Sequence, residues 1–228
     1  VIRRSSILTI RPRSVFSHLP QAARRVGIVY AVLTAFIWLG LLFSGNDLFD
    51  ATVLALGSIS TSGYTPYEGS LVSTIGPVST MWVAIGCLVG AMNISLFWDA
   101  LRDRMAFRDP DIAGIAALIA GLTLLYALAD QNHIITHALD ALFIVTTAGY
   151  SASGDPSPVI LGAVFAALIG GAAASTTGGI KVSRILLLWQ RMGSELAVLS
   201  DPSSVVPVRF RDRPARDGSL IGIWAYVL

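Results

Sequence analysis

Two short segments of this 228-residue chain carry the same series of small, hydroxyl-bearing and aromatic residues. The first reads Thr61-Ser62-Gly63-Tyr64-Thr65 and the second reads Thr147-Ala148-Gly149-Tyr150-Ser151. A single offset of 86 positions, from Gly63 to Gly149, aligns their Thr, Gly and Tyr residues. A loop of small residues held at membrane depth can direct its backbone carbonyls at a cation and replace the water around it. The two segments therefore predict a cation filter.

The composition indicates a membrane protein. Hydrophobic residues make up 54% of the chain and charged residues 13%, whereas a soluble domain has about 25% charged residues. Every Lys and Arg lies within residues 1–25, 102–108 or 181–216. Because basic residues gather on the cytoplasmic side of membrane proteins, we expect these three zones inside. The two stretches between them must then leave the cytoplasm and return.

Acidic residues lie near the predicted outer turns of both stretches: Asp47, Asp50, Glu68, Asp130, Asp140 and Asp155. Such carboxylates can raise the local cation concentration at a pore mouth. They can equally serve only to solvate the outer loops. The sequence favours the second interpretation for any single residue.

The first stretch predicts a spanning helix, a half-length helix and a returning helix. Val26–Phe43 is long enough to span and has no charged residue. Leu48–Ser60 is apolar but reaches only about 20 Å, short of the ~30 Å hydrocarbon core, so it must enter and stop. Asn46 or Asp47 is a reasonable N-cap for it. The chain then returns inward through Leu71–Trp98.

The second stretch predicts the same order of elements with a different ending. Ile112–Ala129 spans outward, Ile134–Thr146 is the second half-length helix, and Pro158–Ile169 begins the return. Residues 170–179 then combine four glycines with three hydroxyl residues, which weakens a helix and frees its carbonyls. We expect a break there, followed by a helix over Val182–Gln190. Close helix packing through small residues is the alternative explanation.

These residues resemble the potassium-transporting membrane subunits of the Trk/Ktr/HKT superfamily. The resemblance rests on both Gly-Tyr segments with the apolar residues before them, and most specifically on Gly170-Gly171 through Ser175-Thr176-Thr177-Gly178-Gly179-Ile180-Lys181-Val182. It implies an all-α membrane protein built from repeated helix–pore-helix–loop–helix units. Tyr64 and Tyr150 stand where Phe is commoner in the family.

The family has four such units, and the resemblance assigns this chain the second and third. We expect a cytoplasmic tail over 1–20, a unit over 21–108 and a unit with a broken inner helix over 109–200. Residues 201–228 would be a linker and, from Ser219 to Leu228, the start of the next unit. The first residue is Val and the last lies in an apolar run, so we expect a fragment of a longer protein.

The resemblance also implies roles for single residues. The filter would comprise Thr61, Ser62, Gly63, Tyr64, Thr146, Thr147, Ala148, Gly149 and Tyr150. The K⁺ ion would bind at Ser62, Gly63, Ala148 and Gly149. The intramembrane gating loop would comprise Gly170, Gly171, Ser175, Thr176, Thr177, Gly178, Gly179 and Lys181. The potassium ion is cargo, and no cofactor is expected in this chain.

The predicted function is potassium uptake across a bacterial plasma membrane by a multi-pass protein. A sodium-permeable transporter and a non-conducting assembly subunit remain alternatives. The resemblance implies a homodimer with a cytoplasmic ring of nucleotide-binding regulatory subunits, in contact with the bilayer and not with nucleic acid. The sequence contains no Gly-x-Ser-x-Gly, His-Glu-x-x-His or P-loop motif, so we expect no enzyme. His133 and His137 could share a surface metal, but their place at a helix start is the favoured explanation.

Overall fold

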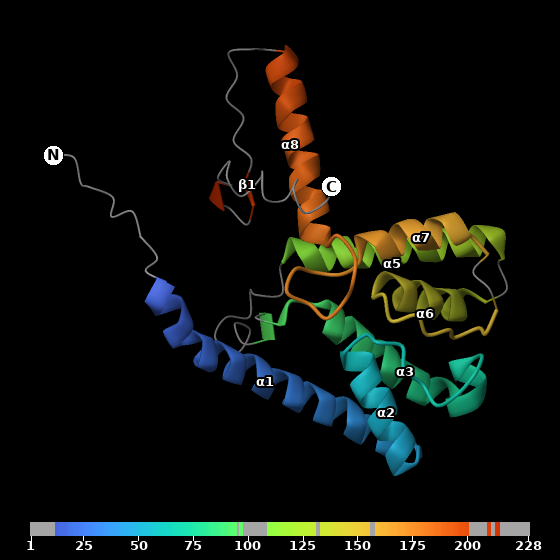
Figure 1. Cartoon of the computed structure of the whole chain (residues 1–228). Helices are drawn as coiled ribbons and strands as arrows, with labels where there is room; N and C mark the ends of the chain where they lie inside the picture. The colour runs from blue at the N-terminus through green and yellow to red at the C-terminus, as the bar shows by residue number, and fades with distance from the viewer. Residues whose placement is uncertain are drawn as a thin grey trace.

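The computed structural model describes residues 12–94, 96–97, 109–130, 133–155, 158–200, 209–210 and 213–214. The helices form two successive units, which we call the first and the second unit (Figure 1). The first unit contains α1 (Pro12–Phe43), α2 (Leu48–Ile59) and α3 (Leu71–Ala91). The second unit contains α5 (Pro110–Ala129), α6 (Ile134–Val145), α7 (Ile160–Ile169) and α8 (Val182–Ser200).

Three helices of the described chain are long and apolar enough to cross a membrane. They are Ala23–Phe43 within α1, Leu71–Ala91 and Pro110–Ala129. α2 and α6 are also apolar, but each has only 12 residues, so neither can cross. Both short helices therefore have the length that the sequence predicted for helices that enter the membrane and stop.

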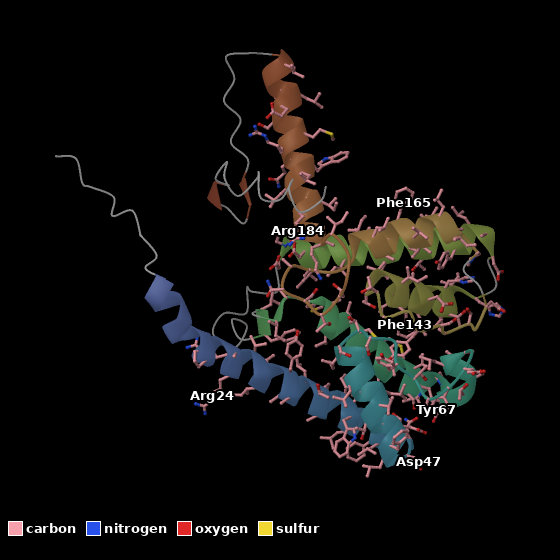
Figure 2. The ribbon with its side chains drawn as sticks, viewed as in Figure 1. Arg24, Asp47, Tyr67, Phe143, Phe165 and Arg184 are labelled. Atoms are coloured by element: carbon pink, nitrogen blue, oxygen red, sulfur yellow. The ribbon has the colours of Figure 1, made fainter. Side chains whose placement is uncertain are left out.

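The short helices α2 and α6 each pack within their own unit, and α3 of the first unit also contacts α6 of the second. α2 contacts α1 and α3, while α6 contacts α5, α7 and α3. The first core cluster includes Leu54 of α2 and Val83 of α3, and it also takes in Phe143 of α6. Phe143 points toward the first unit (Figure 2). A second cluster, with Ile115, Leu122 and Val145, fills the second unit.

Several of the charged residues singled out in the sequence lie toward the end of the helices where they were expected. Figure 2 shows Arg24 and Arg184 toward one end, and Asp47 and Tyr67 toward the other. This arrangement agrees with an inner basic side and an outer acidic side. The basic zone 102–108 and the predicted next unit from Ser219 to Leu228 lie outside the described residues.

Several boundaries differ from the sequence prediction. α1 begins at Pro12, so helix extends into the segment expected as a tail over 1–20. α8 continues to Ser200 rather than ending at Gln190. A pair of two-residue antiparallel strands, β1 (Arg209–Phe210) and β2 (Arg213–Pro214), lies in the predicted linker. Apart from this pair, the described elements are helical.

The first unit also contains a kink that the sequence analysis missed. Gly76 in α3 has φ 81° and ψ 165°, directly before Pro77. Proline removes a helical hydrogen bond and disfavours helical geometry in the preceding residue, and glycine accepts the positive φ. Asp47 occupies the N-cap of α2 as predicted but makes no capping hydrogen bond. Asn46 instead donates to Leu41 O at 2.9 Å and to Ser79 Oγ at 2.7 Å.

The predicted break in the second return helix is confirmed. α7 ends at Ile169 and α8 begins at Val182, with irregular backbone between them. Figure 1 shows α8 leaving the bundle across the direction of α5 and α7. The chain enters and leaves the break at nearly one point, because Ile180 N donates to Leu168 O and Lys181 N donates to Ile169 O, each at 2.8 Å. We call residues 170–181 the inner loop.

Candidate functional site

Both Gly-Tyr segments follow directly from the carboxyl ends of the short helices. We call residues 61–65 the first filter loop and residues 147–151 the second. Their backbones are matched: φ is 50° at Thr61 and 56° at Thr147, and 73° at Gly63 and 74° at Gly149. A positive φ is easy for glycine and costs other residues about 1–2 kcal/mol. The same local strain therefore recurs at an interval of 86 residues.

The N–H groups of both filter loops turn back onto the helices that precede them. Thr61 and Ser62 donate to Ser58 O and Gly57 O at 3.1 and 3.0 Å. In the second loop Thr147 and Ala148 donate to the carbonyls at the matching positions of α6, at 2.9 and 3.0 Å. Each loop is thus fixed through its donors, and its acceptors stay available.

Three successive carbonyl groups in each loop have no hydrogen-bond partner among the described residues. Among the described residues, no hydrogen bond reaches the carbonyl oxygens of Thr61, Ser62 and Gly63, or those at the three matching positions of the second loop, Thr147, Ala148 and Gly149. Most main-chain carbonyls in folded proteins have a partner. Two matched groups of three free carbonyls can bind a cation, because each oxygen carries a partial negative charge.

The two filter loops touch each other. A Cβ atom added to Gly63 would overlap the carbonyl oxygen of Ala148. Tyr150 donates its hydroxyl to the Tyr64 carbonyl at 2.9 Å. Thr146 and Ala148 are buried, whereas Ser62 and Gly149 are exposed. All the predicted filter residues therefore lie in one place, at the contact between the two units.

The inner loop is bonded to the inner ends of both filter loops. Thr176 Oγ1 lies 2.9 Å from the carbonyl oxygens of Ile59, the last residue of α2, and of Gly90 in α3. It also accepts a hydrogen bond from Thr61 Oγ1 at 3.3 Å. Gly178 N donates to Thr147 Oγ1 at 2.8 Å. Thr61 and Thr147, which match each other in the repeat, thus both contact the inner loop.

Other residues of the inner loop hold its own shape. Gly171 N donates to Thr177 Oγ1 at 3.1 Å, and Ser175 Oγ lies 2.8 Å from the same oxygen. A Cβ atom on Gly170 would overlap Gly178 O, and one on Gly179 would lie 2.8 Å from Leu168 O. These glycines therefore allow the two ends of the loop to approach each other closely.

Lys181 closes the inner loop. Its ammonium donates to the carbonyl and the hydroxyl of Thr177 and to Ser175 Oγ at 3.4 Å. The sequence analysis placed this charge only where the path approaches the cytoplasm. In the structure the half-buried ammonium is bonded to the loop that precedes it.

Different carboxylates support the outer ends of the two filter loops. In the first unit, Tyr67 donates its hydroxyl to Asp50. In the second, Asp140 Oδ1 accepts the N–H of Ala152 at 2.6 Å. Two of the six acidic residues predicted near the outer turns therefore have a structural role.

A cavity of about 520 Å³ lies beside the second filter loop. Its lining includes Gly149, Asp140, Asp130 and His137, with His137 Nε2 at 3.7 Å from Asp130 Oδ2. His133 is the N-cap of α6, as expected for a residue at a helix start. Among the residues that the structure describes, no group of three or more His, Cys, Asp or Glu side chains could hold a metal ion.

Sequence reasoning missed the contacts between the loops. The hydrogen bond from Tyr150 to Tyr64 and the contact of Thr176 with Ile59 join residues 86 and 117 positions apart. A hydroxyl on Tyr150 was visible in the sequence, but its partner depends on how the two units pack. The repeat offset could have indicated that adjacent loops meet.

Curated proteins with similar sequences are named as potassium uptake proteins. The Trk system potassium uptake protein TrkH of Escherichia coli K12 is 29% identical over 234 residues, which cover 95% of this chain and 47% of that protein. TrkI of Halomonas elongata is 26% identical over 212 residues, which cover 87% and 43%. This chain thus spans about half the length of the curated relatives it matches.

The fold also matches a solved structure. The crystal structure of the potassium transporter TrkH from Vibrio parahaemolyticus aligns with a TM-score of 0.80 at 22% sequence identity. The alignment covers 91% of this chain and 48% of that one. This likeness confirms the predicted helical membrane fold. No family model matches the chain.

Proposed function

Because this chain is a relative of the Trk potassium uptake proteins across 95% of its own length, we propose that it supplies two pore loops of a potassium-conducting membrane pore. Potassium binds at the backbone carbonyls of Ser62, Gly63, Ala148 and Gly149. The ion is the cargo, and it exchanges its water for these oxygens as it passes. The protein is a multi-pass component of a bacterial plasma membrane.

The observation that carries this proposal is the pair of matched groups of free carbonyls. In both loops the first two N–H groups are bonded to the preceding helix, while three successive carbonyls have no described partner. Where such a carbonyl is buried, as at Ala148, leaving it unpaired costs about 1–3 kcal/mol and needs compensation. A dehydrated cation between the loops provides it. Further loops of the same kind, outside this chain or in another copy, complete the shell.

The inner loop is the proposed gate. It is attached to Thr61 and Thr147 and therefore lies against the inner end of both filter loops. Ions leaving the filter inward must pass it. The bonds of Lys181 to Thr177 and Ser175 hold the loop closed and keep a positive charge beside the path. Regulation is exerted from the basic inner face by a cytoplasmic nucleotide-binding ring, and the complete protein is a homodimer.

Ion flux in vesicles tests the proposed function. The protein in its full natural length is reconstituted, and K⁺ uptake is measured with and without competing Na⁺. We expect K⁺ uptake that resists excess Na⁺. Uptake of both ions without preference would favour a sodium-permeable transporter, and absence of flux would favour an assembly subunit.

Two serine substitutions tie the flux to the filter loops. Gly63→Ser and Gly149→Ser should each lower the discrimination of K⁺ from Na⁺ without preventing membrane insertion. Both glycines have a positive φ that other residues strain to adopt, and a Cβ on Gly63 would also overlap Ala148 O. Gly121→Ser on α5 is the control, since Gly121 lies inside a helix and a Cβ there meets no described atom within 4 Å. Unchanged ion competition in both loop variants would contradict the filter role.

A further inference from the structure

The Tyr150 hydroxyl is the one side-chain group of the described chain that hydrogen-bonds across from one filter loop to the other. We propose that it is a strut that fixes the spacing of the two loops, which makes Tyr150 a positioning residue for ion selectivity. This inference rests on the proposed function of the loops as a potassium filter.

The contact is short and enclosed. Tyr150 Oη donates to the carbonyl oxygen of Tyr64 at 2.9 Å, although the two residues belong to different units. The Tyr150 side chain is 5% exposed. Its ring meets Phe143 edge to face, with 5.5 Å between the ring centroids and 71° between the planes. The ring therefore has little freedom to turn elsewhere, and the bond is partly buried.

The first unit leaves room for the hydroxyl with a glycine. A Cβ atom added to Gly57 of α2 would overlap Tyr150 Oη, and it would lie 2.8 Å from the Tyr64 carbonyl oxygen. The donor and the acceptor of the bond thus meet directly over Gly57. Any side chain at Gly57 would push them apart, so this position of α2 and the hydroxyl of Tyr150 are sterically linked.

The strut acts at the outer end of the free carbonyls. Thr61, Ser62 and Gly63 have carbonyls without a described partner, and the next carbonyl, that of Tyr64, is taken by Tyr150. The bond turns the Tyr64 carbonyl toward α2 and ends the series at Gly63. Gly63 itself lies against Ala148 O. Two adjacent contacts therefore set how far apart the carbonyls of the two loops stand.

Tyr64, which matches Tyr150 in the repeat, makes no equivalent hydrogen bond to a described residue. Tyr64 is 75% exposed, and its hydroxyl has no hydrogen bond to any described residue. The aromatic ring alone therefore does not dictate the contact. Tyr150 differs from Tyr64 because the first filter loop lies beside it and supplies the acceptor.

The strut is tested by measuring the ion selectivity of a variant that lacks only the Tyr150 oxygen. Tyr150→Phe removes only the hydroxyl, and Tyr30→Phe on α1 is the control. In the protein of full natural length, Tyr150→Phe should lower the ratio of K⁺ to Na⁺ flux by roughly three- to tenfold, the range expected for one hydrogen bond. Tyr30→Phe should match the wild type. An unchanged ratio in Tyr150→Phe would overturn the role in selectivity.

A double-mutant cycle tests the geometry without any flux measurement. Gly57→Ala should lower the melting temperature less in Tyr150→Phe than in the wild type, because the second background lacks the Tyr150 oxygen that the methyl group would overlap and keeps only the 2.8 Å approach to Tyr64 O. Equal losses in both backgrounds would overturn the strut. If the cycle shows coupling but the wild type does not distinguish K⁺ from Na⁺, the proposed filter fails and the strut is only structural.

Discussion

The inner helix of the first unit, α3, runs from Leu71 to Ala91, whereas that of the second unit stops at Ile169 and resumes at Val182. The filter loops in front of these helices share their φ angles, their hydrogen bonds to the preceding helix and their free carbonyls. The comparison teaches that two loops of matching geometry can stand beside different inner helices. In the first unit the inner helix is kinked at Gly76, and in the second it is interrupted by the inner loop.

The largest effect should come from shortening the inner loop. Deleting Ala172–Thr176 removes the contacts of Thr176 with Ile59 and Gly90. Several hydrogen bonds of about 1 kcal/mol each hold the loop, so we expect K⁺ flux in vesicles to rise roughly ten- to hundredfold. Dependence on a regulator should weaken at the same time.

The first unit provides the contrast for that deletion. Residues 86–90 match the deleted segment in the repeat, but they lie inside α3, where Gly86, Cys87 and Gly90 are buried. Removing them should abolish folding and flux. Thr176→Val is the milder variant, with Thr123→Val as control because Thr123 bonds only within its own helix. If the 172–176 deletion inserts normally but leaves flux and regulation unchanged, the loop is not a gate.

The two filter glycines should differ in stability. Both have positive φ, so alanine costs about 1–2 kcal/mol at either position. Gly63→Ala also overlaps Ala148 O, whereas a Cβ on Gly149 meets no described atom within 4 Å. Thermal unfolding of the full-length protein should therefore show the larger loss for Gly63→Ala. Equal losses would mean that Gly149 has a close neighbour outside this chain.

Substitutions of the two carboxylates beside the filter loops, Asp140 and Asp50, should differ less in their effects than the two glycine substitutions. Asp140→Ala leaves the Ala152 N–H without its acceptor, directly after the second filter loop, at a cost of about 1–3 kcal/mol. Asp50→Ala leaves only a tyrosine hydroxyl that water can reach. We expect Asp140→Ala to lower the melting temperature more and to raise the K⁺ concentration needed for half-maximal uptake. A larger effect from Asp50→Ala would reverse this order.

The smallest expected effect is the pH dependence of the hydrogen bond between Tyr67 and Asp50. The hydrogen bond to Asp50, with burial and the charge of Asp47, raises the pKa of Tyr67 from 10.0 to about 12. A pKa raised by folding adds stability that is complete below the ordinary value and is lost as pH rises through the folded value. The melting-temperature difference between wild type and Tyr67→Phe should be small and constant from about pH 7 to 9, then shrink toward pH 12. A difference that grows above pH 10 would contradict the assignment.

The sequence predicted the elements that depend on local length and composition. The short helices were expected over Leu48–Ser60 and Ile134–Thr146 and end one residue earlier. An apolar run too short to span, followed by a Gly-Tyr segment, leaves few other structures possible. The break after Ile169 was also predictable, because glycines and hydroxyl residues lower the helix propensity of residues 170–179.

The features that were missed depend on packing between distant segments. The kink at Gly76 was signalled by Pro77, but a Pro inside an apolar run can also be tolerated in a membrane helix. The partners of Lys181 and Tyr150 follow from how the chain folds back on itself, which no local pattern specifies. The roles of the filter and gate residues stay predictions.

The central claim is that the two filter loops bind potassium through four backbone carbonyls. Diffraction from crystals of the full-length protein soaked in Rb⁺ tests it directly, because Rb⁺ replaces K⁺ and gives an anomalous signal. We predict an anomalous peak between the loops, coordinated by the carbonyls of Ser62, Gly63, Ala148 and Gly149, and its loss in Na⁺ alone. A well-ordered pair of loops with no peak between them in Rb⁺ would contradict the account.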